Sequence, residues 1–202
     1  MTTQPAKPAW PRTLQMSHVR KHHPDVVNQV ELAAMANQTL PLTRESKVTL
    51  REITRELARA IMFLDVAPHQ DGLVAPNAVS MAQANFAPEA WMRAVYADEA
   101  PVGFVMLEDW TLVPDESANH FHHGRPYVYL WRFMIDARYQ HLGYGAQALK
   151  AVIAHARTRP GVKTLLLSFV PAEQNPEVFY ARFGFVRTGE IDDGEVVMAL
   201  AL

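Results

Sequence analysis

The sequence predicts a single α/β domain, and three observations carry that prediction. Residues 127–135 are rich in the β-branched and aromatic side chains that strands favour. A turn with two glycines comes next, and then a helical pattern begins. In this pattern apolar residues recur at the spacing of one half-buried helix face: Leu149, Val152, Ile153 and Ala156. A chain of 202 residues is long enough for one such domain with a proper core and short for two.

The other elements are predicted from shorter patterns. Before the central unit we expect a strand at 48–53, helices at 55–64 and 78–85, and a β-hairpin of residues 91–97 and 101–110. Residues 112–126 are predicted to be a loop. After the central unit we expect a strand at 163–170 and a closing hairpin of residues 186–190 and 196–200.

Residues 1–46 differ in composition from the rest of the chain. Three prolines punctuate a start with little apolar content, so we expect an N-terminal extension that is partly disordered or a single helix. Pro24 suits the first turn of a helix running to about residue 37. A lid or a dimer arm is the functional alternative, and a homodimer is one arrangement that the sequence allows. The domain proper is expected at 47–202.

Composition excludes several classes of protein. A net charge of −2 argues against a nucleic-acid-binding protein, and the chain has no cysteine for a disulfide or a thiolate metal site. No apolar run approaches the roughly 18 residues that span a bilayer. The N-terminus lacks the apolar core of a signal peptide. We therefore expect a cytoplasmic protein with no membrane or nucleic-acid partner.

The turn at residues 140–146 is predicted to bind an anion. Glycine lets the backbone approach a ligand closely, and the first N–H groups of a helix suit a phosphate. A P-loop would end in Gly-Lys-Ser/Thr, which the residues after Gly145 do not supply. A dinucleotide site would place a carboxylate at the end of the next strand, and none stands there. A tight turn without a ligand is the remaining alternative.

Two motifs resemble the GCN5-related N-acetyltransferases. Gln140-x-x-Gly143-x-Gly145 is similar to that family's loop for the pyrophosphate of acetyl-coenzyme A. Residues 175–185, from Asn175 through Phe-Tyr to Gly-Phe, are similar to its later signature. The resemblance covers residues 47–202. It implies a mixed, mostly antiparallel sheet flanked by helices and splayed between the fourth and fifth strands.

Within that family the chain most resembles bacterial spermine/spermidine acetyltransferases. The similar stretches are residues 71–77 and 129–136. The resemblance implies transfer of an acetyl group from acetyl-coenzyme A to a primary amine, with a polyamine such as spermidine or spermine as acceptor. The alternatives are acetylation of a protein N-terminus, a lysine or an amino acid, and a coenzyme A-binding sensor without turnover.

The resemblance also implies roles for particular residues. The pyrophosphate would lie on the loop formed by Gln140, His141, Leu142, Gly143, Tyr144, Gly145 and Ala146. The pantetheine arm would follow Phe133, Met134 and Ile135, with an oxyanion donor near Ile135. Asn175 would assist cofactor binding. Tyr180 would protonate the departing thiolate, since a phenol of reference pKa about 10 donates to such a base at low cost; its alternative role is aromatic packing.

A base for the acceptor amine is not identified. Four carboxylates near strand ends are candidates, and most such groups are solvated surface side chains: Glu108, Asp109, Asp115 and Glu116. A water chain to solvent would also suffice.

Two further patterns carry open alternatives. His120, His122 and His123 invite a metal site, but no further ligand at helical spacing completes a tetrahedral set, so we expect none. Aromatic residues alternate along one predicted strand face and either line a polyamine channel or belong to the core: Tyr127, Tyr129 and Trp131.

Overall fold

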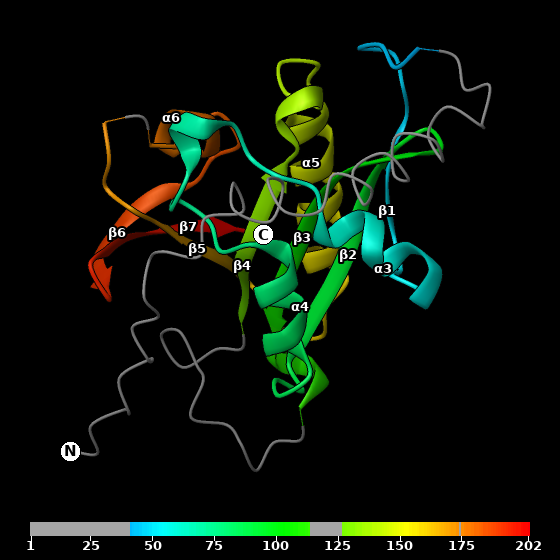
Figure 1. Cartoon of the computed structure of the whole chain (residues 1–202). Coiled ribbons are helices and arrows are strands. Elements are labelled where there is room, and N and C mark those ends of the chain that lie inside the picture. The colour runs from blue at the N-terminus through cyan, green and yellow to red at the C-terminus, as the bar shows by residue number, and fades with distance from the viewer. Residues whose placement is uncertain (1–40, 114–126, 174) are drawn as a thin grey trace. The chain divides into compact units, whose positions relative to one another are not determined.

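The computed structural model describes residues 41–113, 127–173 and 175–202. By compactness the chain divides into Met1–Gln38 and Thr39–Leu202, and all the described residues belong to the second unit. They form a seven-stranded sheet of order β1-β2-β3-β4-β5-β7-β6 (Figure 1). Among the described strands only β4 and β5 pair in parallel. The mixed, mostly antiparallel sheet is therefore confirmed.

The elements lie close to their predicted positions. The strands are β1 (Val48–Arg51), β2 (Ala90–Ala97), β3 (Ala100–Asp109), β4 (Tyr127–Ile135), β5 (Thr164–Phe169), β6 (Val186–Asp192) and β7 (Glu195–Ala201). The helices are α3 (Arg55–Met62), α4 (Asn77–Ala84), α5 (Tyr144–Arg157) and α6 (Glu177–Ala181). Short 3-10 turns are η1 (Pro68–Gln70), η2 (Trp110–Leu112) and η4 (Ala137–Tyr139). Most of the predicted 112–126 loop and residues 1–40 lie outside the described residues.

The sheet opens between β4 and β5. Their parallel pairing covers only Tyr127–Leu130 against Thr164–Leu167. Beyond Leu130, β4 continues to Ile135 with β3 as its partner, so the two central strands separate. The β3–β4 register also shifts between Met106 and Leu107, which leaves Trp131 as an extra residue in β4. Such bulges bend a strand and redirect its side chains. The predicted splay is confirmed.

Helices cover the two faces of the sheet unequally (Figure 1). Helix α5 packs on one face, and its predicted apolar residues are buried: Leu149, Val152, Ile153 and Ala156. Helices α3 and α4 pack on the opposite face through a second cluster around Ile61, Phe104 and Met106. Where β4, β5 and β7 meet, that opposite face carries a small third cluster around Tyr129, Leu166 and Val197. The two faces of the sheet beside the gap therefore carry different clusters of side chains.

The segment before β1 lies against the start of α5. The buried Tyr144 donates its hydroxyl hydrogen bond to the Thr43 carbonyl at 2.7 Å. Arg44 donates from Nη2 to the His141 carbonyl at 3.3 Å. Residues 43–46, expected within the extension, therefore hold the loop at residues 140–146. No helix in the described ranges is long and apolar enough to cross a bilayer.

Candidate active site

The loop between β4 and α5 has the backbone shape that its glycines predict. The η4 turn carries the chain from β4 to Gln140, and α5 begins at Tyr144. His141 and Gly143 adopt left-handed conformations, with φ of 65° and 85°. A Cβ built on Gly143 would meet none of the described residues within 4 Å, so the backbone conformation and not crowding favours glycine there. The N-cap of α5 thus borders open space, and the N–H groups of a helix's first turn suit an anionic group.

Gly145 brings three elements together. A Cβ on Gly145 would lie 3.6 Å from Ile135 Cγ1 and 3.7 Å from Phe179 Cζ. These are ordinary van der Waals distances, so the position is close-packed without being crowded. The start of α5, the end of β4 and helix α6 therefore meet at one point beside the gap.

Phe133, Met134 and Ile135 occupy the part of β4 that has separated from β5. Phe133 and Ile135 pack with the α5-side core, while Met134 is 5% exposed and packs on the α3–α4 side. The Phe133 and Phe179 rings are 6.4 Å apart. Among the described strands β4 pairs here only with β3, so its edge toward β5 can take an extended ligand except at the Ile135 carbonyl, which accepts a hydrogen bond from Gln140.

Tyr180 lies on the α5 side of the gap, in an aromatic cluster. Its ring centroid is 5.2 Å from that of Phe179 and 5.7 Å from that of Phe185. The side chain is buried, and burial raises the pKa of its hydroxyl above the ordinary value. Within the described part of the chain, no hydrogen bond or charge acts on that pKa. The phenol is therefore a protonated donor.

Asn175 shapes the start of α6. Its Oδ1 accepts from the Glu177 amide at 3.0 Å, and its Nδ2 donates to the Ala172 carbonyl at 2.9 Å. Both ends of this side-chain amide are thus used locally, one turn before Tyr180. The position of Tyr180 depends on this turn.

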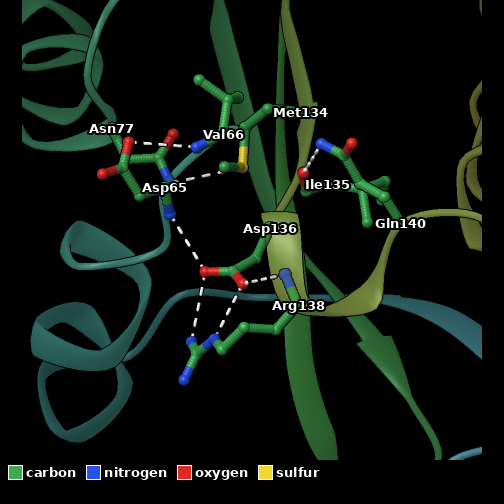
Figure 2. A network of polar contacts seen from close by, with 8 residues as sticks. All are labelled: Asp65, Val66, Asn77, Met134, Ile135, Asp136, Arg138 and Gln140. Atoms are coloured by element: carbon green, nitrogen blue, oxygen red, sulfur yellow. Dashed lines mark hydrogen bonds and ion pairs between the residues drawn. The ribbon is translucent and has the colours of Figure 1, made fainter. Parts of the chain in front are cut away.

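A buried carboxylate that the sequence analysis missed lies at the end of β4. Asp136 is 1% exposed and accepts from the Asp65 amide at 3.0 Å (Figure 2). It also accepts from the Arg138 amide at 3.0 Å and from Arg138 Nε at 2.8 Å. The sequence does hold a signal for this carboxylate that the site prediction did not include: an aspartate directly after an apolar strand, with an arginine two residues later.

Gln140 extends this network to the loop. Its Nε2 donates to the Ile135 carbonyl at 2.9 Å, as Figure 2 shows, and to Gln70 Oε1 at 2.7 Å. Nearby, Asn77 Nδ2 donates to the Ile61 carbonyl at 2.9 Å. The Gln140 side chain thus ties the loop to β4 and to the α3–α4 connection. Gln140 therefore stabilises the loop through hydrogen bonds within the protein.

The opposite side of the gap carries the aromatic row of β4. Tyr129 is buried, and Tyr127 and Trp131 pack beside it, so the expected shared face is present. Burial, reinforced by Glu108, raises the pKa of Tyr127 to about 12. Arg132, whose guanidinium lies 5.0 Å over the Trp131 ring, has its pKa lowered by burial. Both the channel and the core interpretation fit these positions.

Of the four carboxylates considered as bases, Asp109 is committed elsewhere. It is fully buried on the α5 side, with Arg159 Nε at 2.6 Å and the Thr111 hydroxyl donating to it at 2.6 Å. Asp115, Glu116 and the histidines at 120–123 lie outside the described residues. Within the described ranges no cluster of histidines and carboxylates has the makings of a metal site.

Comparison with known proteins identifies the family. Residues 52–185 match the acetyltransferase (GNAT) family. The spermine/spermidine N(1)-acetyltransferase of Bacillus subtilis is 31% identical over 156 residues, which cover 77% of this chain and 99% of that protein.

Solved structures agree on the fold. Aminoglycoside acetyltransferase AAC(6')-Ib in complex with coenzyme A superposes with a TM-score of 0.60 at 14% identity, covering 77% of this chain and 95% of the other. A GNAT acetyltransferase from Elizabethkingia anophelis with acetyl-CoA bound gives a TM-score of 0.51 at 15% identity, with 77% and 98% covered. The chain therefore belongs to the acetyltransferase (GNAT) family and is an acetyl-CoA-dependent N-acetyltransferase.

Proposed function

We propose that this enzyme transfers the acetyl group of acetyl-CoA to a primary amine of a polyamine such as spermidine or spermine. One observation carries the choice of acceptor. On the side of the gap away from α5, the aromatic row of β4 lies in the field of several carboxylates. The name of the Bacillus subtilis relative supports the same choice.

The α5 side supplies the cofactor half of the reaction in this proposal. Backbone amides of residues 141–146 hold the pyrophosphate, with Gln140 bracing the loop. The open backbone edge at Phe133, Met134 and Ile135 pairs with the pantetheine arm. An N–H group near Ile135 stabilises the oxyanion that develops at the thioester carbonyl. Tyr180, held protonated by burial, donates its proton to the departing thiolate.

The opposite side supplies the acceptor half. After burial, Glu195, Asp192 and Glu108 add to the raised pKa of Tyr129, so three carboxylates lie near this face, together with the Arg132 guanidinium. Aromatic faces attract ammonium groups, and carboxylates attract them more strongly where water is partly excluded. Arg132 already lies over the Trp131 ring, so in this proposal the ammonium groups of a ligand meet the other aromatic rings and the carboxylates of this face. An acceptor with several ammonium groups suits this surface better than a monoamine.

A panel of amines tests the proposal through kcat/KM for thiol release. We expect spermidine to exceed a monoamine of similar length by about tenfold or more, since a hydrogen bond to a charged group contributes about 1.5–3 kcal/mol and about 1.4 kcal/mol corresponds to a factor of ten. Glu108→Gln should reduce that advantage, whereas Glu190→Gln, on the exposed strand β6, should preserve it. Equal values for spermidine and the monoamine contradict the polyamine assignment.

The same panel separates the alternatives. Thiol release with lysine peptides or amino acids only would assign a different acceptor class. Binding of acetyl-CoA, measured by calorimetry, without release by any amine would favour a sensor.

A further inference from the structure

A chain of hydroxyl groups crosses the sheet on the acceptor side of the gap. The Tyr129 hydroxyl donates to Ser168 Oγ at 2.5 Å. The Ser168 hydroxyl in turn donates to the carboxylate of Glu195 in a short hydrogen bond. The three residues come from β4, β5 and β7, so this hydroxyl chain exists only in the folded sheet.

The chain lies where the two central strands separate. Tyr129 pairs with Leu166 near the end of the β4–β5 ladder, and Ser168 is the first β5 residue beyond it. The bulge at Trp131 comes two residues after Tyr129. The stretch of β4 that lacks a β5 partner, proposed for the pantetheine arm, begins just after this bulge. The phenol of Tyr129 is thus next to the place where an acceptor would meet the thioester.

The chain also runs from the interior toward solvent. Tyr129 is buried, while Glu195 is partly exposed beside the β6–β7 turn. Burial raises the pKa of Tyr129, so this phenol remains neutral. A neutral hydroxyl has both a donor and acceptor lone pairs, so it can accept one proton while giving up its own. The carboxylate is the anionic group at which such a chain ends.

The reaction needs a group that takes a proton from the acceptor amine. An alkyl ammonium has a reference pKa of about 10.4, so only about one molecule in 10³ is neutral at pH 7. The ammonium nitrogen has no lone pair with which to attack a thioester. A proton must therefore leave before or during the attack.

We propose that Tyr129, Ser168 and Glu195 form a relay that takes this proton from the acceptor ammonium. The ammonium gives a proton to the Tyr129 oxygen, Tyr129 gives its own to Ser168, and Ser168 gives its own to the Glu195 carboxylate. The products are a neutral amine and a protonated Glu195, which returns the proton to solvent. The relay rests on the amine acceptor of the proposed function, and it does not require that amine to be a polyamine.

A purely structural role for the chain makes a different prediction. If the hydrogen bonds only fasten β4, β5 and β7 together, their loss lowers stability and affects all amines equally at every pH. If they move a proton, the defect depends on whether the amine still carries one. The basicity of the acceptor therefore distinguishes the two roles.

The test compares Tyr129→Phe and Glu195→Gln with wild-type enzyme, using Glu190→Gln as the matched control. Glu190 is an exposed carboxylate on the β6–β7 hairpin that also carries Glu195, and it is not part of the hydroxyl chain. With a strongly basic amine at pH 7, we expect kcat/KM of both variants to fall by about 10²-fold or more, the scale of positioned proton transfer. The defect should shrink as pH approaches the amine pKa. With a fluorinated amine that is already neutral at pH 7, both variants should match wild type.

Several outcomes would overturn the relay. A loss of equal size for both amines at every pH, together with a lower Tm, would assign the chain a structural role. Wild-type kcat/KM in both variants would show that these three residues take no part in the reaction. If wild-type enzyme acetylates no amine, the proposed function fails and the relay fails with it. If wild type acetylates amines and the variants show no dependence on basicity, the relay alone fails.

Discussion

Two tyrosines near the opening between β4 and β5 lie on opposite faces of the sheet, and their surroundings differ. Tyr180, on the α5 side, lies among aromatic rings, and burial is what raises its pKa. Tyr129, on the opposite side, donates to Ser168 and lies near carboxylates. The two sides of the opening thus differ: one is apolar and holds the phenol that we propose as proton donor, and the other is polar and holds the hydroxyl chain that we propose as proton acceptor.

This difference matches the two proton transfers of acetyl transfer to an amine. A thiolate leaving group needs a proton, and an incoming ammonium must lose one. A phenol with no hydrogen bond to the described residues is suited to the first, and a hydroxyl chain that ends at a carboxylate is suited to the second. The proposed roles of Tyr180 and Tyr129 can therefore be tested separately.

The largest expected effect is at Tyr180. Tyr180→Phe keeps the ring and removes the proton, so kcat should fall by about 10²–10⁴-fold. Affinity for acetyl-CoA and Tm should change little, since the hydrogen bond forms mainly in the transition state. Single-turnover kinetics measures this where product release does not limit the rate.

A packing role at Tyr180 gives the opposite pattern. Phenylalanine would then be nearly silent, while Tyr180→Ala would destabilise the fold by about 3–5 kcal/mol, as aromatic truncations in cores do. A Tyr180→Phe variant with wild-type kcat would show that Tyr180 is not the proton donor.

The next effect concerns the loop on the same side. Gly143 has φ of 85°, and a left-handed conformation costs a side-chain-bearing residue about 1–2 kcal/mol. Gly143→Val should therefore raise the dissociation constant of acetyl-CoA at least tenfold, measured by calorimetry, since the loop must distort and the added branches enter the open space beside it. Gly145→Ala, whose Cβ would make ordinary contacts, should have a smaller effect. Normal affinity in Gly143→Val would rule out this loop as the pyrophosphate site.

A smaller effect is expected from truncation. We propose that residues 1–40 are dispensable for folding and cofactor binding. Deletion of residues 1–46 also removes the carbonyl of Thr43, the acceptor for the buried Tyr144 hydroxyl. That should lower the free energy of unfolding by about 1–3 kcal/mol, because a buried donor loses its partner. Denaturant titration of the two truncated forms checks this, and identical stabilities would show that the contact contributes nothing.

The smallest expected effect lies outside the gap, at His155 of α5. Burial, then Arg159, lowers the pKa of this imidazole, which stacks on Trp91 at 4.0 Å beside Asp109 and Arg93. The unfolded chain therefore takes up a proton at higher pH than the folded one. Stability present above about pH 6.5 should be lost progressively below it. His155→Phe should flatten the fall of Tm between pH 7 and pH 5; an unchanged slope would show that other groups cause it.

The sequence predicted the parts of the site that depend on local patterns. β4 is found at the predicted residues 127–135, and the buried face of α5 follows its apolar spacing. The left-handed Gly143 follows from the motif and from the chemistry of glycine. These features need only neighbouring residues.

The polar connections could not be predicted, because distant segments create them. Asp136 meets the Asp65 amide, and Gln140 meets Gln70, only after α3 and α4 have folded onto the sheet. Ser168 and Glu195 meet because β7 lies between β5 and β6 in the sheet. Single residues without a motif carry no signal of such partners. The base was left unassigned for this reason.

The most direct test of the account is the structure of the enzyme with coenzyme A and a polyamine bound together. We predict that the pyrophosphate lies on the amides of residues 141–146 and that the thiol sulfur lies within hydrogen-bonding distance of the Tyr180 hydroxyl. We also predict that the acceptor nitrogen lies on the opposite side of the gap, at the Tyr129 hydroxyl. A complex in which cofactor and amine both lie on one side of the gap, or in which neither tyrosine hydroxyl reaches the reacting atoms, would contradict it.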